Sequence, residues 1–280
     1  MKGGRNSERI GMGAPRSYQT EAIVIKQIKL GEADKILTIY TPGFGKLKVV
    51  AKGACRPGSK LGGNVGPLTY SVMLLARGRN LDIVTQSQTM EGFLALKNDL
   101  WRMAYGLYIL ELIDSFTVEN SENRPLFDLL LDTLYQLCRV DSNEIVLRYF
   151  ELHLLHYLGY RPELHRCVKC NSPLKPVVNF FNSSQGGVLC PRCSQNEPMS
   201  RSLSVDALKI LRLWQSCDYA TAKRVQIKSE LSSELEQVLQ EYMECLLQRK
   251  LRSMTWLREL KNIEPLTRLY VNRRENLLKP

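Results

Sequence analysis

The stretch CVKC at residues 167–170, followed by CPRC at residues 190–193, is the most informative part of this sequence. Nineteen residues separate the two pairs, so the spacing is C-x2-C-x19-C-x2-C. Each C-x2-C motif offers two thiolates from one tight turn, and Zn²⁺ prefers four such ligands in a tetrahedron. The spacing therefore predicts one structural Zn²⁺ per chain. The predicted ligands are Cys167, Cys170, Cys190 and Cys193, which together leave no open position for catalysis.

Other interpretations of the cysteines remain open. The two pairs could be unrelated, reduced and partly buried thiols, or they could form disulfides. Disulfides are disfavoured because no secretion signal is visible and because Cys55, Cys138, Cys217 and Cys245 have the pattern of small apolar packing residues. His165, two residues before the first pair, is a fifth candidate ligand, although a surface histidine fits the position better.

Length and composition set the broad class. The 280 residues are enough for two or three domains, and the hydrophobic content of 44% allows an ordinary core. No run of 18 apolar residues occurs, so no transmembrane helix is predicted. Residues 1–16 are basic and glycine-rich without an apolar segment. They predict a disordered extension, or a native start at Met12, and not a secretion signal.

The net charge of +11 is distributed unevenly. Residues 17–94 hold ten lysines and arginines against five acidic residues, and residues 95–160 reverse this ratio. Residues 161–200 and 201–280 are basic again, with net charges of +3 and +5. Basic zones flanking an acidic one predict a polyanionic partner, although solvated lysines on a soluble protein give the same composition.

The first 94 residues have the pattern of a small β-barrel. Strands are expected at residues 22–28, 35–41, 46–52, 70–77 and 81–88. Such a set fits a sandwich, an SH3-like barrel or an OB-fold, and the pattern does not separate them. Strand 46–52 is amphipathic, with Lys46, Lys48 and Lys52 opposite an apolar face, and the next loop adds Arg56 and Lys60. These cations predict a groove for phosphates, or an ordinary solvated sheet face.

The remaining chain is predicted to be helical. Helices are expected near residues 96–110, 126–137, 143–158, 204–214 and 235–252. The third is apolar nearly all round and is expected at the centre, with His153 and His156 packed in the core. The last helix is expected to end in Arg249, Lys250 and Arg252, and residues 264–280 to form a frayed basic helix. The four-cysteine segment, with two short strands, is inserted between helices.

Catalytic motifs are scarce. The sequence has no Walker A loop, GxGxxG, GxSxG or HExxH motif. Its three histidines all lie within residues 153–165, which makes a nucleophile–base pair elsewhere in the chain hard to build. An enzyme is therefore not expected.

Three stretches, in this order, resemble the RecO family of bacterial DNA repair proteins. The first is TEAIVIKQIKLGEADKILTIYTPGFGKLKVVAKGACRPGSKLGG at residues 20–63. The second is GPLTYSVMLLARGRNLDIVTQSQTME at residues 66–91. The third is HYLGYRPELHRCVKC at residues 156–170, followed by VLCPRC at residues 188–193. The resemblance spans roughly residues 18–255.

The resemblance implies an α+β fold in three units. An N-terminal OB-fold barrel would occupy residues 17–94, a helical domain residues 95–160 and 201–280, and an inserted zinc-binding module residues 161–200. It implies a nucleic-acid-binding set on the barrel, and the matching positions are Lys46, Lys48, Lys52, Arg56, Lys60, Arg77 and Arg79.

The resemblance also implies a function. A recombination mediator of this family binds single- and double-stranded DNA, anneals complementary strands and helps load RecA onto DNA coated by single-strand-binding protein. The implied partners are RecR and the acidic C-terminal tail of single-strand-binding protein, with no membrane association. The implied location is the bacterial cytoplasm, at the nucleoid. Competing interpretations are a zinc-ribbon nucleic-acid-binding factor in transcription or RNA maturation, and an enzyme with a structural zinc.

Overall fold

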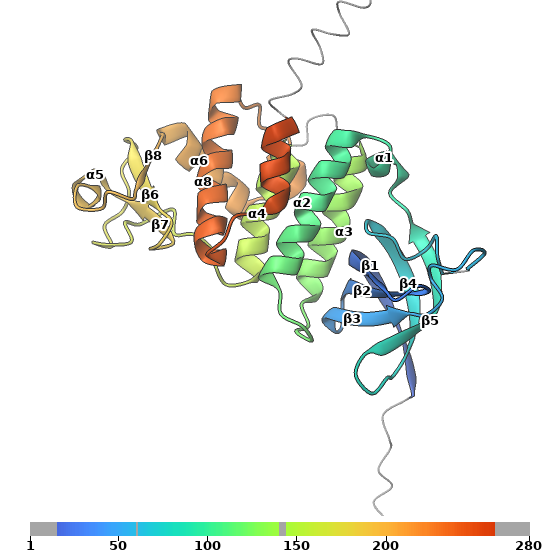
Figure 1. The fold of residues 1–280 in the computed structure, drawn as a ribbon. Helices are drawn as coiled ribbons and strands as arrows, with labels where there is room; N and C mark the ends of the chain where they lie inside the picture. Colours follow the sequence, from blue (N-terminus) through green and yellow to red (C-terminus); the bar gives the residue numbers. More distant parts are fainter. Residues whose placement is uncertain (1–15, 60, 140–143, 261–280) are drawn as a thin grey trace, which may run out of the picture.

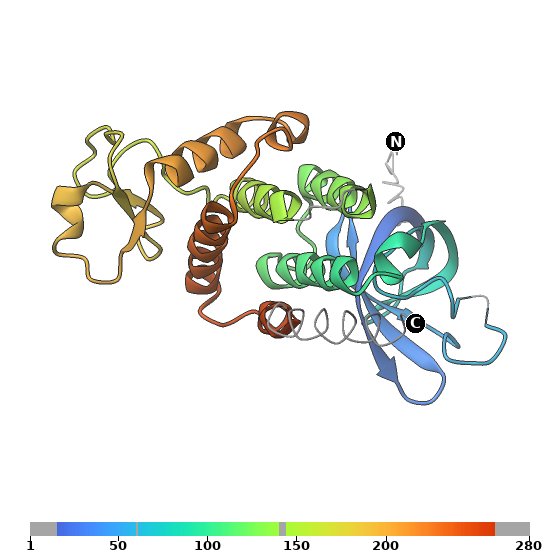
Figure 2. The ribbon, with the colours of Figure 1, turned by 90° about the horizontal axis from the view of Figure 1, so that it is seen from above.

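Three structural units lie in a row along the molecule (Figure 1, Figure 2). The computed structural model describes residues 16–59, 61–139 and 144–260. A β-barrel forms one end, a group of helices the middle, and a small sheet carrying the cysteines the other end. Whether the units fold as separate domains with the predicted bounds stays a prediction. Within the described ranges, no helix combines the length and apolar character needed to cross a membrane.

The first unit is a closed barrel of five strands. The strands are β1 (Ser17–Leu30), β2 (Asp34–Thr41), β3 (Gly45–Ala51), β4 (Thr69–Ala76) and β5 (Asp82–Glu91). Their order around the barrel is β1-β2-β3-β5-β4, with β3 and β5 parallel and the other neighbours antiparallel. A five-stranded Greek-key barrel of this kind is an OB-fold. The OB-fold prediction is therefore confirmed, and the sandwich and SH3-like alternatives are wrong.

Strands β1 and β2 contribute side chains to two different hydrophobic cores. Because side chains alternate along a strand, Val24, Leu37 and Ile39 fill the barrel interior. Ile23 and Tyr40 point outward and join the large core formed with the helices. One face of the barrel is therefore closed by protein, and the helical unit is held against it.

The middle unit consists of helices packed around a central one. These are α1 (Leu94–Lys97), α2 (Leu100–Phe116), α3 (Arg124–Arg139), α4 (Glu144–Tyr157), α6 (Val205–Ser216), α7 (Tyr219–Ala222) and α8 (Ser229–Leu247). Helix α4 packs against α3, α6 and α8, as its apolar pattern predicts. Pro125 lies in the first turn of α3, and the Ser204 hydroxyl accepts a hydrogen bond from the amide of Ala207 at 3.1 Å, capping α6.

A buried ion pair lies inside this unit. The Arg148 guanidinium is 2.8 Å from the Glu151 carboxylate, and both side chains lie almost entirely out of solvent. The Tyr108 hydroxyl, on α2, donates to the same carboxylate at 2.6 Å. Because a buried charge is stable only when it is paired, these contacts fix α2 against α4.

Two helical predictions need correction. His156 is exposed, and only His153 is partly buried, with its Nε2 donating to the Trp214 carbonyl at 3.0 Å. The last predicted helix ends early, at Leu247, because Gln248 takes the left-handed conformation with φ 52°. Residues 252–260 then form another helical segment, whose first amides donate to Glu111. The predicted basic helix at residues 264–280 lies outside the described residues.

The third unit is a three-stranded sheet with a short helix. It comprises β6 (Asn179–Asn182), β7 (Gly187–Leu189), α5 (Pro191–Ser194) and β8 (Arg201–Leu203), in the sheet order β7-β6-β8. It is inserted between α4 and α6, as expected. Strand β8 was not predicted, because its three residues, Arg201–Leu203, carry no apolar run or turn signal that marks a strand.

Candidate metal centre and nucleic-acid interface

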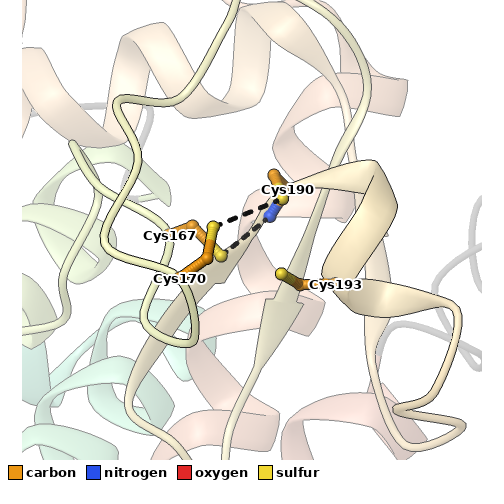
Figure 3. Close-up of side chains that lie close together, drawn as sticks. All are labelled: Cys167, Cys170, Cys190 and Cys193. Carbon is orange, nitrogen blue, oxygen red and sulfur yellow. Dashed lines mark hydrogen bonds between the residues drawn. The ribbon is translucent and has the colours of Figure 1, made fainter.

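The four predicted cysteines converge at one point of the third unit (Figure 3). Their Sγ atoms all lie within 4.8 Å of one another, and the sulfurs of Cys170 and Cys190 are 3.9 Å apart. Cys167 is buried, while Cys170 is exposed at the rim. Four thiolates this close would repel one another without a cation between them, so the donor set fits a tetrahedral metal ion.

Local turn chemistry places each pair. The Asn171 amide donates to the Cys167 carbonyl at 2.8 Å, closing a tight turn. Asn171 adopts φ 58°, which asparagine tolerates better than most residues. In the second pair, Cys190 precedes α5, Pro191 takes its first position, and the Cys193 amide donates back to the Cys190 carbonyl at 3.0 Å.

The surroundings of the first pair favour its thiolate forms. The hydroxyl and amide of Ser172 lower the pKa of Cys170 to about 6. Burial would raise the pKa of Cys167, but backbone amides of Cys170, Cys190 and Lys169 outweigh it and lower that pKa. One of these is the Cys190 amide, 3.4 Å from the Cys167 sulfur (Figure 3). His165 is exposed and lies outside the sulfur cluster, so it is a surface histidine.

The lysine face of β3 differs from its prediction. Lys46 is buried, and its ammonium donates to the Asp114 carbonyl at 2.5 Å and lies 3.4 Å from the Asp114 carboxylate. Lys48 is half-exposed and pairs with Glu119 at 2.6 Å, which raises its pKa. The alternation of the strand is correct, but Asp114 in the last turn of α2 and the acidic segment after that helix cover this end of the face. The expected row of three solvated ammonium groups is therefore wrong for Lys46.

Backbone contacts hold this acidic segment in place. The Asn120 amide donates to the Lys46 carbonyl at 3.0 Å. Gly45 has φ +64°, and a Cβ built there would lie 1.9 Å from the Ser121 carbonyl oxygen. Only glycine fits so close an approach of two chain segments. The joint between barrel and helices therefore depends on Gly45.

The other predicted cations lie at the opposite end of β3 and beyond it. Lys52 and Arg56 are exposed in the loop that follows the strand. That loop is tied to the start of β2, because the Gly53 amide donates to the Asp34 carboxylate at 2.8 Å. Lys60 lies outside the described residues. The loop thus presents its cations beside the turn between β1 and β2.

Arg77 and Arg79 occupy the hairpin between β4 and β5, and both are exposed. The Arg77 guanidinium lies 4.8 Å from the ring centroid of Tyr18, a cation–π distance. The Tyr18 hydroxyl donates to Asp82 at 2.6 Å, so burial and this carboxylate raise the Tyr18 pKa. Tyr18 therefore holds Arg77 on the barrel surface.

Three further lysines on β1 and β2 were missed by sequence reasoning, and they lie on both faces of the sheet. Lys26 is opposite Thr38, which in turn is opposite Lys48, and Lys29 is opposite Lys35. Lys26 and Lys29 are exposed, although Lys26 also lies 3.5 Å from Asp114. Because side chains alternate along a strand, Lys29 points to the face opposite that of Lys26. Which residues lie beside each lysine depends on strand register, which the sequence does not show.

An OB-fold barrel with exposed cations, joined to helices and a four-cysteine cluster, defines a class of nucleic-acid-binding proteins. In OB-folds the β2–β3 face and the β1–β2 and β4–β5 loops contact the ligand. The exposed cations described above lie on or beside those elements.

Comparisons with known proteins give the family. Residues 15–93 match the family described as Recombination protein O N terminal, and residues 97–255 match Recombination protein O C terminal. A DNA repair protein RecO from Dehalococcoides mccartyi is 37% identical over 250 residues, covering 89% of this chain and 98% of that protein. Another, from a Roseiflexus species, is 38% identical over 248 residues, covering 89% and 87%. A third, from Halalkalibacterium halodurans, is 30% identical over 246 residues, covering 88% and 96%.

The chain belongs to the RecO family. This is a family of DNA repair proteins and not of catalytic enzymes, so DNA binding is its expected chemistry. The expectation of a DNA repair family, taken from the resemblance, is confirmed. The expectation that the chain is not an enzyme, drawn from the scarcity of catalytic motifs, agrees with that family.

Proposed function

We propose that this protein is a recombination mediator. It binds single- and double-stranded DNA, anneals complementary strands, and helps RecA load onto DNA coated by single-strand-binding protein. RecR and the acidic C-terminal tail of single-strand-binding protein are its partners, and it acts in the cytoplasm at the nucleoid. The observation that carries the proposal is the group of exposed cations at the ligand-binding elements of an OB-fold in a DNA repair family.

The proposed set of DNA-contacting residues differs from the one that the sequence suggested. Lys46 is left out, because its ammonium is buried against Asp114. The retained set consists of Lys52, Arg56, Lys60, Arg77 and Arg79, with Lys26, Lys29 and Lys35 added from the strand register. Lys48 would join this set only when its ion pair with Glu119 opens. Lys60 is kept on the sequence alone.

Annealing follows from charge without bond chemistry. Cations on one protein neutralise phosphates of two strands, which lowers the repulsion that opposes pairing. Each phosphate contact releases counterions, so affinity should fall steeply with salt and vary little with sequence. The acidic zone of residues 95–160 repels DNA and confines it to the barrel end.

An annealing assay without ATP tests this proposal. Complementary labelled oligonucleotides, coated with single-strand-binding protein, are mixed with the full chain, and pairing is followed by energy transfer. We expect acceleration that the double variant Lys52→Glu/Arg79→Glu loses. Lys209→Glu, which reverses an exposed lysine of α6 far from the barrel, is the control. Equal annealing by the double variant and the control, or salt-independent DNA binding, would refute the phosphate-contact mechanism.

We further propose that the four cysteines hold one structural Zn²⁺. A Zn–S distance of about 2.3 Å in a tetrahedron places sulfurs about 3.8 Å apart. The 3.9 Å between the sulfurs of Cys170 and Cys190 fits that value. Bound zinc would fix the third unit, with no role in bond chemistry. Purified protein should contain one zinc per chain, and Cys170→Ser should lower that content, whereas Cys245→Ser, exposed and outside the cluster, should not.

A further inference from the structure

A groove on the helical unit has no role in the DNA-binding proposal. It has a volume of about 560 Å³ and lies between α3 and α4, with α7 forming a third side. Its apolar lining includes Pro125, Leu129 and Val146. A groove of this size accommodates several side chains of a bound segment.

Four rings converge in this groove. Tyr149 and His153 have ring centroids 4.1 Å apart, and Tyr219 approaches Tyr149 edge-on at 5.4 Å. The ring of Tyr157 lies 6.4 Å from that of His153 and is 39% exposed. Aromatic faces carry partial negative charge, so they attract cations as well as apolar groups.

The polar lining of the groove is acidic. Asp128 and Asp132 come from α3, and Asp218 from the start of α7. None of the described residues that line the groove is a lysine or arginine, although Arg124 reaches Asp128 from outside at 3.0 Å. Arg124 at Asp128 and Arg224 near Asp218 partly compensate two of these carboxylates, so Asp132 contributes most to the negative field of the groove.

The carboxylates and rings act on one another. Burial, and then nearby groups that include Asp218 and Asp132, raise the pKa of Tyr149 to about 12. Partial burial, and then the charge of Asp128, raise the pKa of Asp132. Burial is the larger cause of both pKa shifts, and the neighbouring groups add to it. A cation placed there would lower this electrostatic cost.

We propose that this groove docks a basic, amphipathic segment of a partner protein. An arginine or lysine of the segment lies over the rings of Tyr149 and His153 and faces Asp132 and Asp218, while apolar side chains contact the groove floor. Helices that dock in grooves use this arrangement of anchors. Charge complementarity selects the occupant, because DNA phosphates and acidic peptides would meet three carboxylates. The surface is separate from the proposed DNA contacts.

A designed peptide tests the groove directly. The probe is a fluorescent amphipathic helix with leucines on one face and arginines beside them, titrated into the full chain by anisotropy. A charge-inverted probe carries glutamates in place of the arginines. We expect saturable binding of the arginine probe only, weakened about tenfold or more by Asp132→Lys. Asp206→Lys is the matched control, because Asp206 is an exposed helical aspartate outside the groove.

Several results would overturn the proposal. These are no binding of the arginine probe, equal binding by Asp132→Lys, or preference for the glutamate probe. Displacement of the arginine probe by an oligonucleotide would assign the groove to nucleic acid instead. If the probe binds only after residues 261–280 or 1–15 are deleted, the occupant is this chain itself and not a partner. Circular dichroism checks that Asp132→Lys is folded, and a shift of the His153 ring protons on binding locates the probe.

Discussion

Replacing Glu119 by glutamine should strengthen DNA binding, which is an unusual direction for a substitution. The Glu119 carboxylate lies 2.6 Å from the Lys48 ammonium, and the two side chains are 43% and 50% exposed. Glutamine keeps the size of the side chain but removes the charge. Lys48 would then be free to contact a phosphate, while the backbone joint at Asn120 stays intact.

The expected gain in DNA affinity follows from one ammonium group, that of Lys48, becoming available for a phosphate. Each phosphate contact on single-stranded DNA contributes about −0.7 to the slope of log K against log salt. At about 0.1 M salt, that slope corresponds to about fivefold in affinity. Glu119→Gln should therefore bind about fivefold more tightly than the parent protein, with a slope more negative by about 0.7.

Fluorescence anisotropy with a labelled oligonucleotide over a range of salt concentrations measures both quantities. Asp206→Asn is the matched control, since it also removes one negative charge, here from the exposed ion pair between Asp206 and Lys209 on α6. Misfolding cannot imitate a gain in affinity. If Glu119→Gln and Asp206→Asn behave alike, the acidic segment does not compete with phosphate for Lys48, and this part of the interface is wrong.

Three other substitutions test the scaffold. Gly45→Ala should lower the free energy of unfolding, measured by urea denaturation, by about 1–3 kcal/mol, because Gly45 has a left-handed backbone and lies against the Ser121 carbonyl. Gly43→Ala is the control, since a Cβ at Gly43 would meet open space. Arg148→Met should cost about 3–5 kcal/mol by leaving Glu151 charged and buried, and adding Glu151→Leu should recover much of the loss. Burial lowers the pKa of His153, so its stabilising contribution is complete above pH 6.5 and is lost as pH falls toward the lowered value; His153→Gln should flatten that part of the stability curve.

Local signals made much of the fold predictable. Pro125, Ser204 and Gly159 act within one helical turn of their own position, and each lies at the expected helix end. The alternation in β3 likewise depends only on strand geometry. The cysteine cluster was predictable because both halves of a C-x2-C pair are fixed by one turn, and metal chemistry demands that the pairs meet.

Long-range contacts were not predictable in the same way. Lys46 and Lys48 both occupy the polar positions of an alternating strand, yet only Lys46 is buried. It is covered by Asp114, which lies 68 residues further along the chain. Nothing near the strand indicates which carboxylates will cover it. The predicted end of α8 was wrong for a different reason. Gln248 adopts a left-handed conformation, which glutamine does not favour, and the helix stops there.

The row of three units has a thermodynamic consequence. The helices lie between the barrel and the cysteine unit in both views (Figure 1, Figure 2). Substitutions at distant sites without shared partners change free energy additively. Changes at Arg79 and at Cys193 should therefore sum in a double-mutant cycle, and any departure from the sum would measure coupling transmitted through the helices. Where the sum holds, an assay at one end of the molecule reports on that end alone.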